Sequence, residues 1–101
     1  MFVHFVLFWL EDPSNPEVIE NFEKGLKELV TIDLVKGSHI GKSVPSERAV
    51  VDSSYTYSLL LQFDNKKDQD IYQDLPEHHD FINKCSQYWT KVQVFDSEEI
   101  G

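Results

Sequence analysis

The chain has 101 residues, and its 18 acidic and 9 basic side chains give a formal net charge of −9 at pH 7. This charge argues against nucleic acid and membrane surfaces as partners, because phosphate binding requires clustered lysine and arginine. A hydrophobic content of 41% is sufficient for a buried core. The length predicts a single domain over residues 1–101.

The apolar first ten residues do not resemble a signal peptide, because they lack a positively charged start and are followed at once by Glu11 and Asp12. They are also too short to cross a bilayer. Cys85 is the single cysteine, which excludes an internal disulfide and leaves no thiol pair for a metal. We therefore expect a cytoplasmic protein.

Residues 2–10 predict a strand that is apolar on both faces, with His4 as the polar exception. A strand with one solvated face alternates apolar and polar residues, so this strand requires cover on both faces. One layer of helices covers a single face. The other face must meet a second subunit, a ligand, or both.

The next element is a helix. Asn15 followed by Pro16 is typical of an N-cap and a first helical residue, and apolar residues recur with helical spacing from Val18 to about Ile32. Gly25 lies inside this helix, where it costs about 1 kcal/mol relative to alanine. A glycine here allows close approach of another element.

The middle of the chain predicts two strands. A weaker strand covers residues 35–44, a polar loop covers residues 45–54, and a clear strand covers residues 55–63. Gly37 and Gly41 in the weaker strand indicate a bulge, a sheet edge or a close backbone approach.

A second helical region runs from Asp64 to Tyr72, breaks at Pro76 and resumes over residues 77–88. One side of this region carries residues spaced alternately by three and four, namely Ile71, Leu75, His78, Ile82, Cys85 and Trp89. His78 is the lone imidazole in this stripe. A polar group that faces inward beside a helix break marks a candidate site, whereas His79 is expected to point to solvent.

A short strand over residues 91–96 and a frayed acidic tail from Ser97 complete the chain. The order β-α-β-β-α-β predicts a ferredoxin-like α+β fold, with one antiparallel sheet and the helices on one face. The apolar second face of the first strand would leave a large exposed patch on a monomer. We therefore predict a homodimer whose two sheets pack face to face.

Several short segments, in order along almost the whole chain, resemble one family. They are His4–Phe8, Gly41–Ser43, Tyr55, Phe63–Asn65, Tyr72-x-x-Leu75-Pro76-x-His78-x-x-Phe81 and Val94–Asp96. Together they resemble the Dabb family of stress-responsive dimeric α/β-barrel domain proteins. The resemblance implies a homodimer in which two ferredoxin-like sheets form a barrel, which agrees with the pattern of the strands.

The resemblance also implies a pocket. Plant members that are similar include a polyketide cyclase, which closes a ring by intramolecular aldol condensation without a cofactor. In such members the equivalents of His4, Tyr72 and His78 face one pocket. This chain has Leu26 where the cyclase type has a pocket tyrosine, and Leu75 where the family often has histidine. Both differences make the pocket less polar and put the cyclase reaction itself in question.

The candidate catalytic residues are His78 as a general base, Tyr72 as its partner and His4 as a group that positions a substrate oxygen. The candidate substrate-binding residues are Leu26, Leu75, Phe81 and Trp89. This set suits a small apolar carbonyl or aromatic compound and a cyclase, lyase or isomerase reaction that uses no cofactor. We expect no metal site, because no ligand spacing such as HExxH supports one.

A second hypothesis stays open. His78 can instead cap the helix after Pro76 or bond a buried backbone carbonyl, in which case the protein is a non-catalytic homodimeric stress protein whose pocket is filled by its own side chains. The two hypotheses differ in whether a cavity large enough for a ligand opens beside His78.

Overall fold

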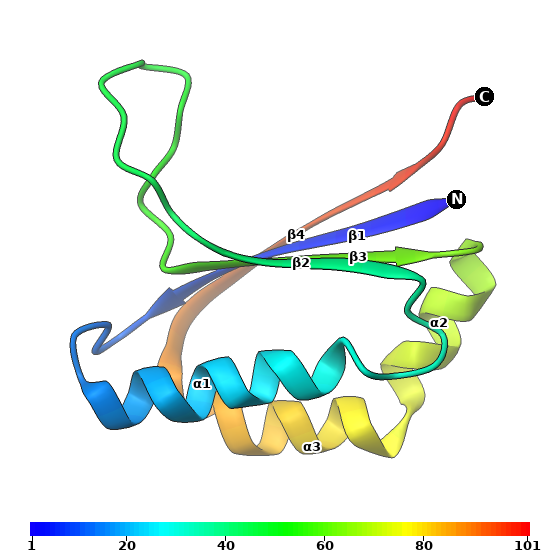
Figure 1. Ribbon diagram of the computed structural model, residues 1–101, viewed down its shortest axis with the longest axis horizontal. Helices are drawn as coiled ribbons and strands as arrows, with labels where there is room; N and C mark the ends of the chain where they lie inside the picture. Colours follow the sequence, from blue (N-terminus) through cyan, green and yellow to red (C-terminus); the bar gives the residue numbers. More distant parts are fainter.

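The computed structural model describes all 101 residues as a four-stranded antiparallel sheet in the order β2-β3-β1-β4, with the helices on one face (Figure 1). The elements are β1 (Phe2–Leu10), α1 (Pro16–Leu29), β2 (Gly37–Lys42), β3 (Tyr57–Phe63), α2 (Lys66–Asp74), α3 (Pro76–Cys85), the 3-10 turn η1 (Ser86–Tyr88) and β4 (Trp89–Glu98). This arrangement confirms the predicted ferredoxin-like fold.

The first helix begins where the sequence predicts, and the other two begin within two residues of the predicted positions. The side chain of Asn15 accepts a hydrogen bond from the backbone N–H of Glu17 at the start of α1, and Pro16 is the first helical residue. Asn65 caps α2 in the same way through the backbone N–H of Asp68. Both caps satisfy backbone donors that have no partner within their helix.

The core lies between the sheet and the helices. Along β1 the even-numbered side chains are buried and the odd-numbered ones are partly exposed. The buried set includes His4, which is 5% exposed. Its strand neighbours are Leu61 on β3 and Asp96 on β4. The alternation therefore places a histidine among core residues, facing the helices.

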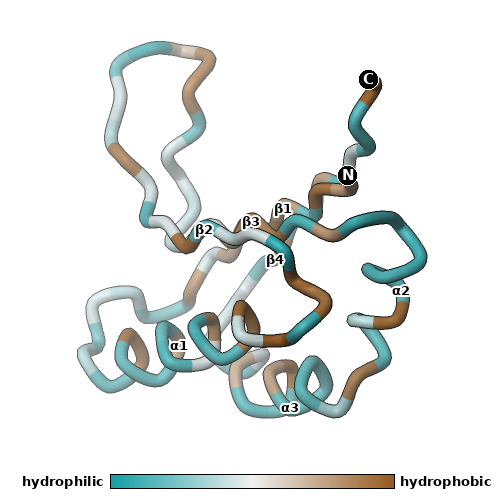
Figure 2. Tube along the Cα trace, turned by 45° about the vertical axis from the view of Figure 1, so that its right-hand side comes forward, coloured by the Kyte–Doolittle hydropathy of each residue, from teal (hydrophilic) through white to brown (hydrophobic).

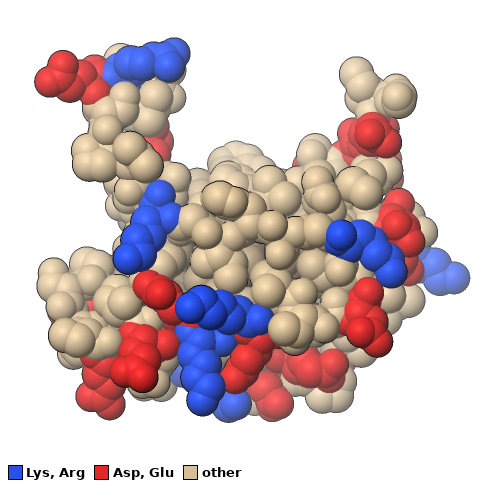
Figure 3. All heavy atoms as spheres, viewed as in Figure 1, with Lys and Arg blue, Asp and Glu red and all other residues tan.

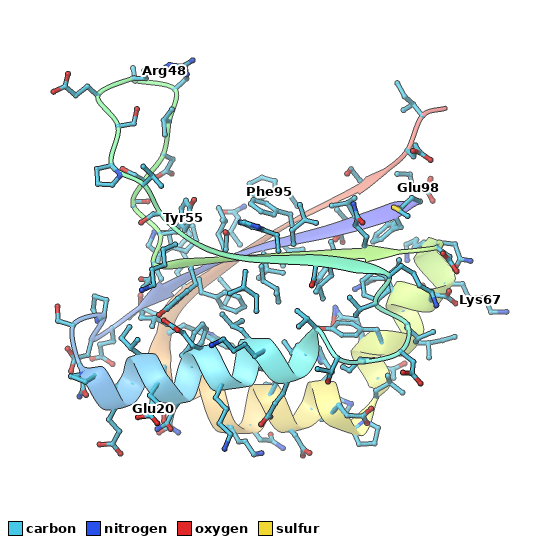
Figure 4. The ribbon with its side chains drawn as sticks, viewed as in Figure 1. Glu20, Arg48, Tyr55, Lys67, Phe95 and Glu98 are labelled. Atoms are coloured by element: carbon cyan, nitrogen blue, oxygen red, sulfur yellow. The ribbon has the colours of Figure 1, made fainter.

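The opposite face of the sheet has no helical cover. Phe95 is 54% exposed there. Figure 4 shows both Phe95 and Tyr55 on the side of the sheet away from the helices. The segment of residues 43–56 and the C-terminus both rise on this same side (Figure 1). The predicted second apolar face is thus present and uncovered in a single chain.

Charge and hydropathy follow the same layering. The outward turns of α1 and α3 are hydrophilic (Figure 2). Charged side chains gather over the helical layer and on the two rising segments, and they leave much of the sheet region free of charge (Figure 3). The edge of the sheet seen in this view is therefore less charged than the helical layer.

Several predictions about the elements are wrong. The weaker strand covers Gly37–Lys42 rather than residues 35–44, and the helix after Pro76 ends at Cys85 rather than at residue 88. The tail from Ser97 is not frayed, because β4 pairs with β1 as far as Glu98 and the N–H of Glu99 donates to the Met1 carbonyl. Ile71 is 43% exposed and does not belong to an inward stripe. The third strand begins at Tyr57, two residues later than predicted.

Candidate functional site

A hydrogen bond between two adjacent strands holds His4. The Nδ1 of His4 on β1 lies 2.6 Å from Oδ1 of Asp96 on β4, and the two residues are direct partners in the strand register. The imidazole is buried, whereas the Asp96 side chain is 44% exposed. The pair therefore has one end in the core and one end at the surface of the edge strand.

Tyr72 lies next to this pair. It is 1% exposed, and its ring centroid is 6.4 Å from that of His4 and 5.0 Å from that of His78. Phe63 packs on it from β3, with 5.1 Å between centroids. The tyrosine thus bridges the histidine of the sheet and the histidine of α3.

The turn between α2 and α3 sets the position of His78. Leu75 has an extended backbone, with φ −68° and ψ 146°, and Pro76 is the first residue of α3. The N-cap makes no side-chain hydrogen bond, and the backbone N–H of His78 donates to the Leu75 carbonyl. The imidazole therefore does not cap the helix, which was one of the structural roles considered for it.

His78 has a free nitrogen in a buried position. Its Nδ1 is buried and makes no hydrogen bond. Burial lowers the pKa of this imidazole below its ordinary value, and the nearby His79 and His4 lower it further, while Asp74 opposes the shift. The neutral form with a basic nitrogen is therefore favoured near neutral pH. His79 is exposed, as predicted.

The Tyr72 hydroxyl remains protonated. Burial alone raises the pKa of this hydroxyl well above its ordinary range, with no hydrogen bond or charge contributing. A neutral hydroxyl can donate a hydrogen bond, and a neutral imidazole can accept a proton. The arrangement can therefore place a hydrogen-bond donor and a base on one small molecule.

The predicted apolar residues are distributed differently. Leu26 and Phe81 are core residues, 0% and 6% exposed, and the rings of Phe8 and Trp89 pack against each other with 5.3 Å between centroids. Leu75 lines a surface hollow that none of the three polar candidates lines. The structure thus brings His4, Tyr72 and His78 together. Leu26 and Phe81 belong to the same core cluster as Tyr72, and Leu75 and Trp89 pack against that cluster.

Asp96 is the residue that the sequence reasoning missed. The motif Val94–Asp96 was noted only as part of the resemblance, and no role was given to the carboxylate. The signal was available in the strand alternation, because Val92, Val94 and Asp96 occupy alternate positions on β4 and therefore share a face. No group of three or more His, Cys, Asp or Glu side chains is placed to bind a metal ion.

The fold and the sequence define the family. The sequence model of the Stress responsive A/B Barrel Domain, Dabb, matches residues 2–99. The chain therefore belongs to the Dabb family. No curated protein matches the chain.

Solved structures share this fold over nearly the whole chain. The Arabidopsis thaliana protein At3g17210 is similar, with 29% identity, a TM-score of 0.83 and coverage of 100% of this chain and 97% of that one. A Dabb family protein with a ferredoxin-like fold from Mesorhizobium loti has 20% identity and a TM-score of 0.81, covering 99% and 97%. A hydroxynitrile lyase from Passiflora edulis has 17% identity and a TM-score of 0.78, covering 95% and 90%. None of the helices is both long and apolar enough to span a membrane.

Proposed function

We propose that the chain binds a small apolar carbonyl compound beside His78 and transfers a proton to and from it without a cofactor. The observation that carries this proposal is the buried, unbonded Nδ1 of His78 next to Tyr72. A buried polar atom without a partner is costly in a folded protein, and functional sites are where such atoms are retained.

The chemistry follows from the two protonation states. His78 removes a proton from the carbon next to the carbonyl, and the electron pair moves onto the carbonyl oxygen to form an enolate. The Tyr72 hydroxyl donates a hydrogen bond to that oxygen and stabilises its charge. The protonated imidazole then returns the proton. His4, held by Asp96, offers its second ring nitrogen to the same ligand.

An apolar ligand fits the neighbouring strand surface. Val92 and Val94 are 37% and 44% exposed although they lie on the face of β4 that carries Asp96. Exposed valines beside a polar pair are a surface that gains from contact with an apolar ligand body. A hydroxynitrile lyase, an enzyme named for a small compound with a hydroxyl and a nitrile group, shares this fold.

We also propose that the functional unit is a homodimer, joined through the uncovered sheet face. The exposed Phe95 on that face supports this, because soluble monomers rarely keep large apolar patches. Structures with the same fold from Thermobifida fusca and Bacteroides fragilis are described as dimeric. A stress-responsive role accords with the family description, and a cytoplasmic location remains part of the proposal.

A hydrogen–deuterium exchange assay tests the proposed proton transfer directly. Acetophenone is incubated with the protein in D2O, and loss of the methyl proton signal is followed by NMR. We expect exchange faster than in buffer, with the acceleration abolished in His78→Gln and reduced in Tyr72→Phe. Tyr88→Phe, which changes a tyrosine outside the site, is the matched control.

The alternative is a non-catalytic dimer whose pocket is filled by its own side chains. A His78 imidazole whose NMR signals respond to none of acetophenone, benzaldehyde and phenol, together with exchange equal to that of buffer, would establish that alternative. Signals that move with a compound but without accelerated exchange would show binding without turnover.

A further inference from the structure

We propose that a hollow between α1 and α3, separate from the histidine site, binds a small aromatic carboxylate. The hollow has a volume of about 350 Å³, within the range of ligand sites in proteins. The lining residues that matter here are Asn21, Lys24 and Glu28 on α1 and Phe81, Lys84 and Tyr88 on α3 and η1. Neither His4 nor Tyr72 nor His78 takes part in it.

The charge of the hollow is opposite to that of the chain. Lys24 and Lys84 outnumber the single carboxylate of Glu28, although the chain as a whole carries −9. Three other hollows on the surface are lined by more acidic than basic side chains. One of these hollows shares Lys24 and Glu28 with the proposed site, and an anion is favoured in the proposed site by its excess of lysine over carboxylate.

The two lysines are available to a ligand. Neither Lys24 nor Lys84 belongs to one of the ion pairs of the chain, whereas Lys42 pairs with Glu23 and Lys66 with Asp70. They extend from two different helices that face each other across the hollow. A carboxylate between them would accept from both ammonium groups.

The base of the hollow suits an aromatic ring. Phe81 is 6% exposed and Tyr88 is partly buried. Packing therefore holds both rings in place, and each ring presents its accessible part to the hollow. At Gly25 the backbone of α1 comes close to α3, because a Cβ there would lie 2.8 Å from Sγ of Cys85 and 3.2 Å from the Phe81 ring. Backbone, thiol and phenyl ring thus form an apolar floor.

Polar groups at the edge restrict the class of ligand. The hydroxyl of Tyr88 accepts a hydrogen bond from the side chain of Asn21 at 3.3 Å and keeps its own proton to donate. Glu28 disfavours a second negative charge and can accept from a hydroxyl. The ligand that meets all these groups is an aromatic ring with one carboxylate.

Three benzene derivatives of similar size isolate the charge requirement, because all three carry the same ring. Benzoate, benzyl alcohol and benzylamine are titrated into the intact protein, and the backbone amide signals of the protein are followed by NMR. We expect benzoate to bind most tightly and benzylamine most weakly, with the largest shifts at Gly25, Lys84 and Tyr88. Weaker binding at raised salt is expected because the lysines are solvent-accessible.

Two sets of variants are expected to change benzoate affinity in opposite directions, which a general loss of structure would not do. Lys24→Met with Lys84→Met should weaken benzoate binding roughly tenfold, and Glu28→Gln should strengthen it about threefold, as expected for partly exposed charge pairs. Lys66→Met, a lysine outside the hollow, is the control and should leave the affinity unchanged. Circular dichroism confirms that each variant is folded.

Several results would overturn the proposal. These are equal binding of benzoate and benzylamine, the same affinity in the double lysine variant, or no shifts at the hollow at millimolar benzoate. Shifts confined to the surroundings of His78 and abolished by His78→Gln would place the anion in the histidine site instead. Because the lysine and histidine variants are independent, this proposal and the proposed proton transfer can fail separately.

Discussion

His4 and Asp96 face each other across paired strands, and their side chains meet at 2.6 Å between Nδ1 and Oδ1. Among the hydrogen bonds made by side chains, only the one between the N-terminal amine and Glu99 joins residues farther apart in sequence. The hydrogen bond between His4 and Asp96 connects the edge strand β4 to the central strand β1 at the candidate site.

The first prediction concerns this hydrogen bond. Replacement Asp96→Ala should lower the free energy of unfolding by about 1 kcal/mol, because the buried imidazole of His4 loses its partner. NMR should show a downfield, slowly exchanging Nδ1–H signal of His4 in the wild type and its loss in the variant. Asp80→Ala, at an exposed carboxylate on α3, is the control and should retain the signal. A downfield proton that survives Asp96→Ala would contradict the assigned pair.

The second prediction concerns pH. Burial lowers the pKa of His78 in the folded state, so the unfolded chain takes up the proton at higher pH than the folded chain. The free energy of unfolding is therefore highest above the unfolded-state pKa of this imidazole, about 6.5, and decreases as the pH falls through that value. Urea unfolding at about pH 7.5 and about pH 5.5 should show a smaller loss in His78→Asn than in the wild type. His39→Asn, at an exposed histidine on β2, should behave like the wild type. Identical pH dependence in all three proteins would refute the role of His78.

The third prediction concerns the contact of α1 with α3. Gly25→Ala should destabilise the protein by about 1–2 kcal/mol, because overpacking against Cys85 and Phe81 outweighs the gain of about 1 kcal/mol in helix propensity. The effect should be smaller in a Cys85→Ala background, where the 2.8 Å contact is absent. Urea unfolding of the four proteins in this cycle measures the coupling. If the two changes in the free energy of unfolding were additive, Sγ of Cys85 would not be the atom that the added methyl group contacts.

The fourth prediction concerns the uncovered sheet face. Phe95→Glu should convert the proposed dimer into a monomer of about 11.8 kDa, because two carboxylates would enter an apolar interface. Sedimentation equilibrium distinguishes the two states. Ile71→Glu, which charges an exposed apolar residue on α2, should leave the dimer intact. A wild-type protein that sediments as a monomer would end the proposal for this face.

The strand pattern predicted the layers because it depends on alternation alone. His4 appears as the polar exception in an apolar strand, and the structure buries it on the helix side, the side that the resemblance implied and that alternation alone left open. The N-cap at Asn15 was readable for a similar reason, since capping depends on neighbours in sequence. Features that rest on local geometry could therefore be derived without coordinates.

Features that depend on distant partners could not. The helical stripe through Ile71 was counted across Pro76, but the break at Leu75 resets the phase, and α2 buries Gln69 and Tyr72 instead. The length of β4 was underestimated because its polar end is held by pairing with β1. Asp96 was missed for the same reason, since its importance comes from a residue 92 positions earlier.

The extended backbone of Leu75 has a consequence for how the candidate site arose. In one continuous helix, residues six apart point about 120° away from each other and are separated by about 9 Å along the axis. Tyr72 and His78 are six apart, yet their rings are neighbours. The change of direction at a single residue thus turns two side chains from different sides of a helix into a pair. If residue 75 became helical, the chain would keep both side chains, but their rings would no longer be in contact.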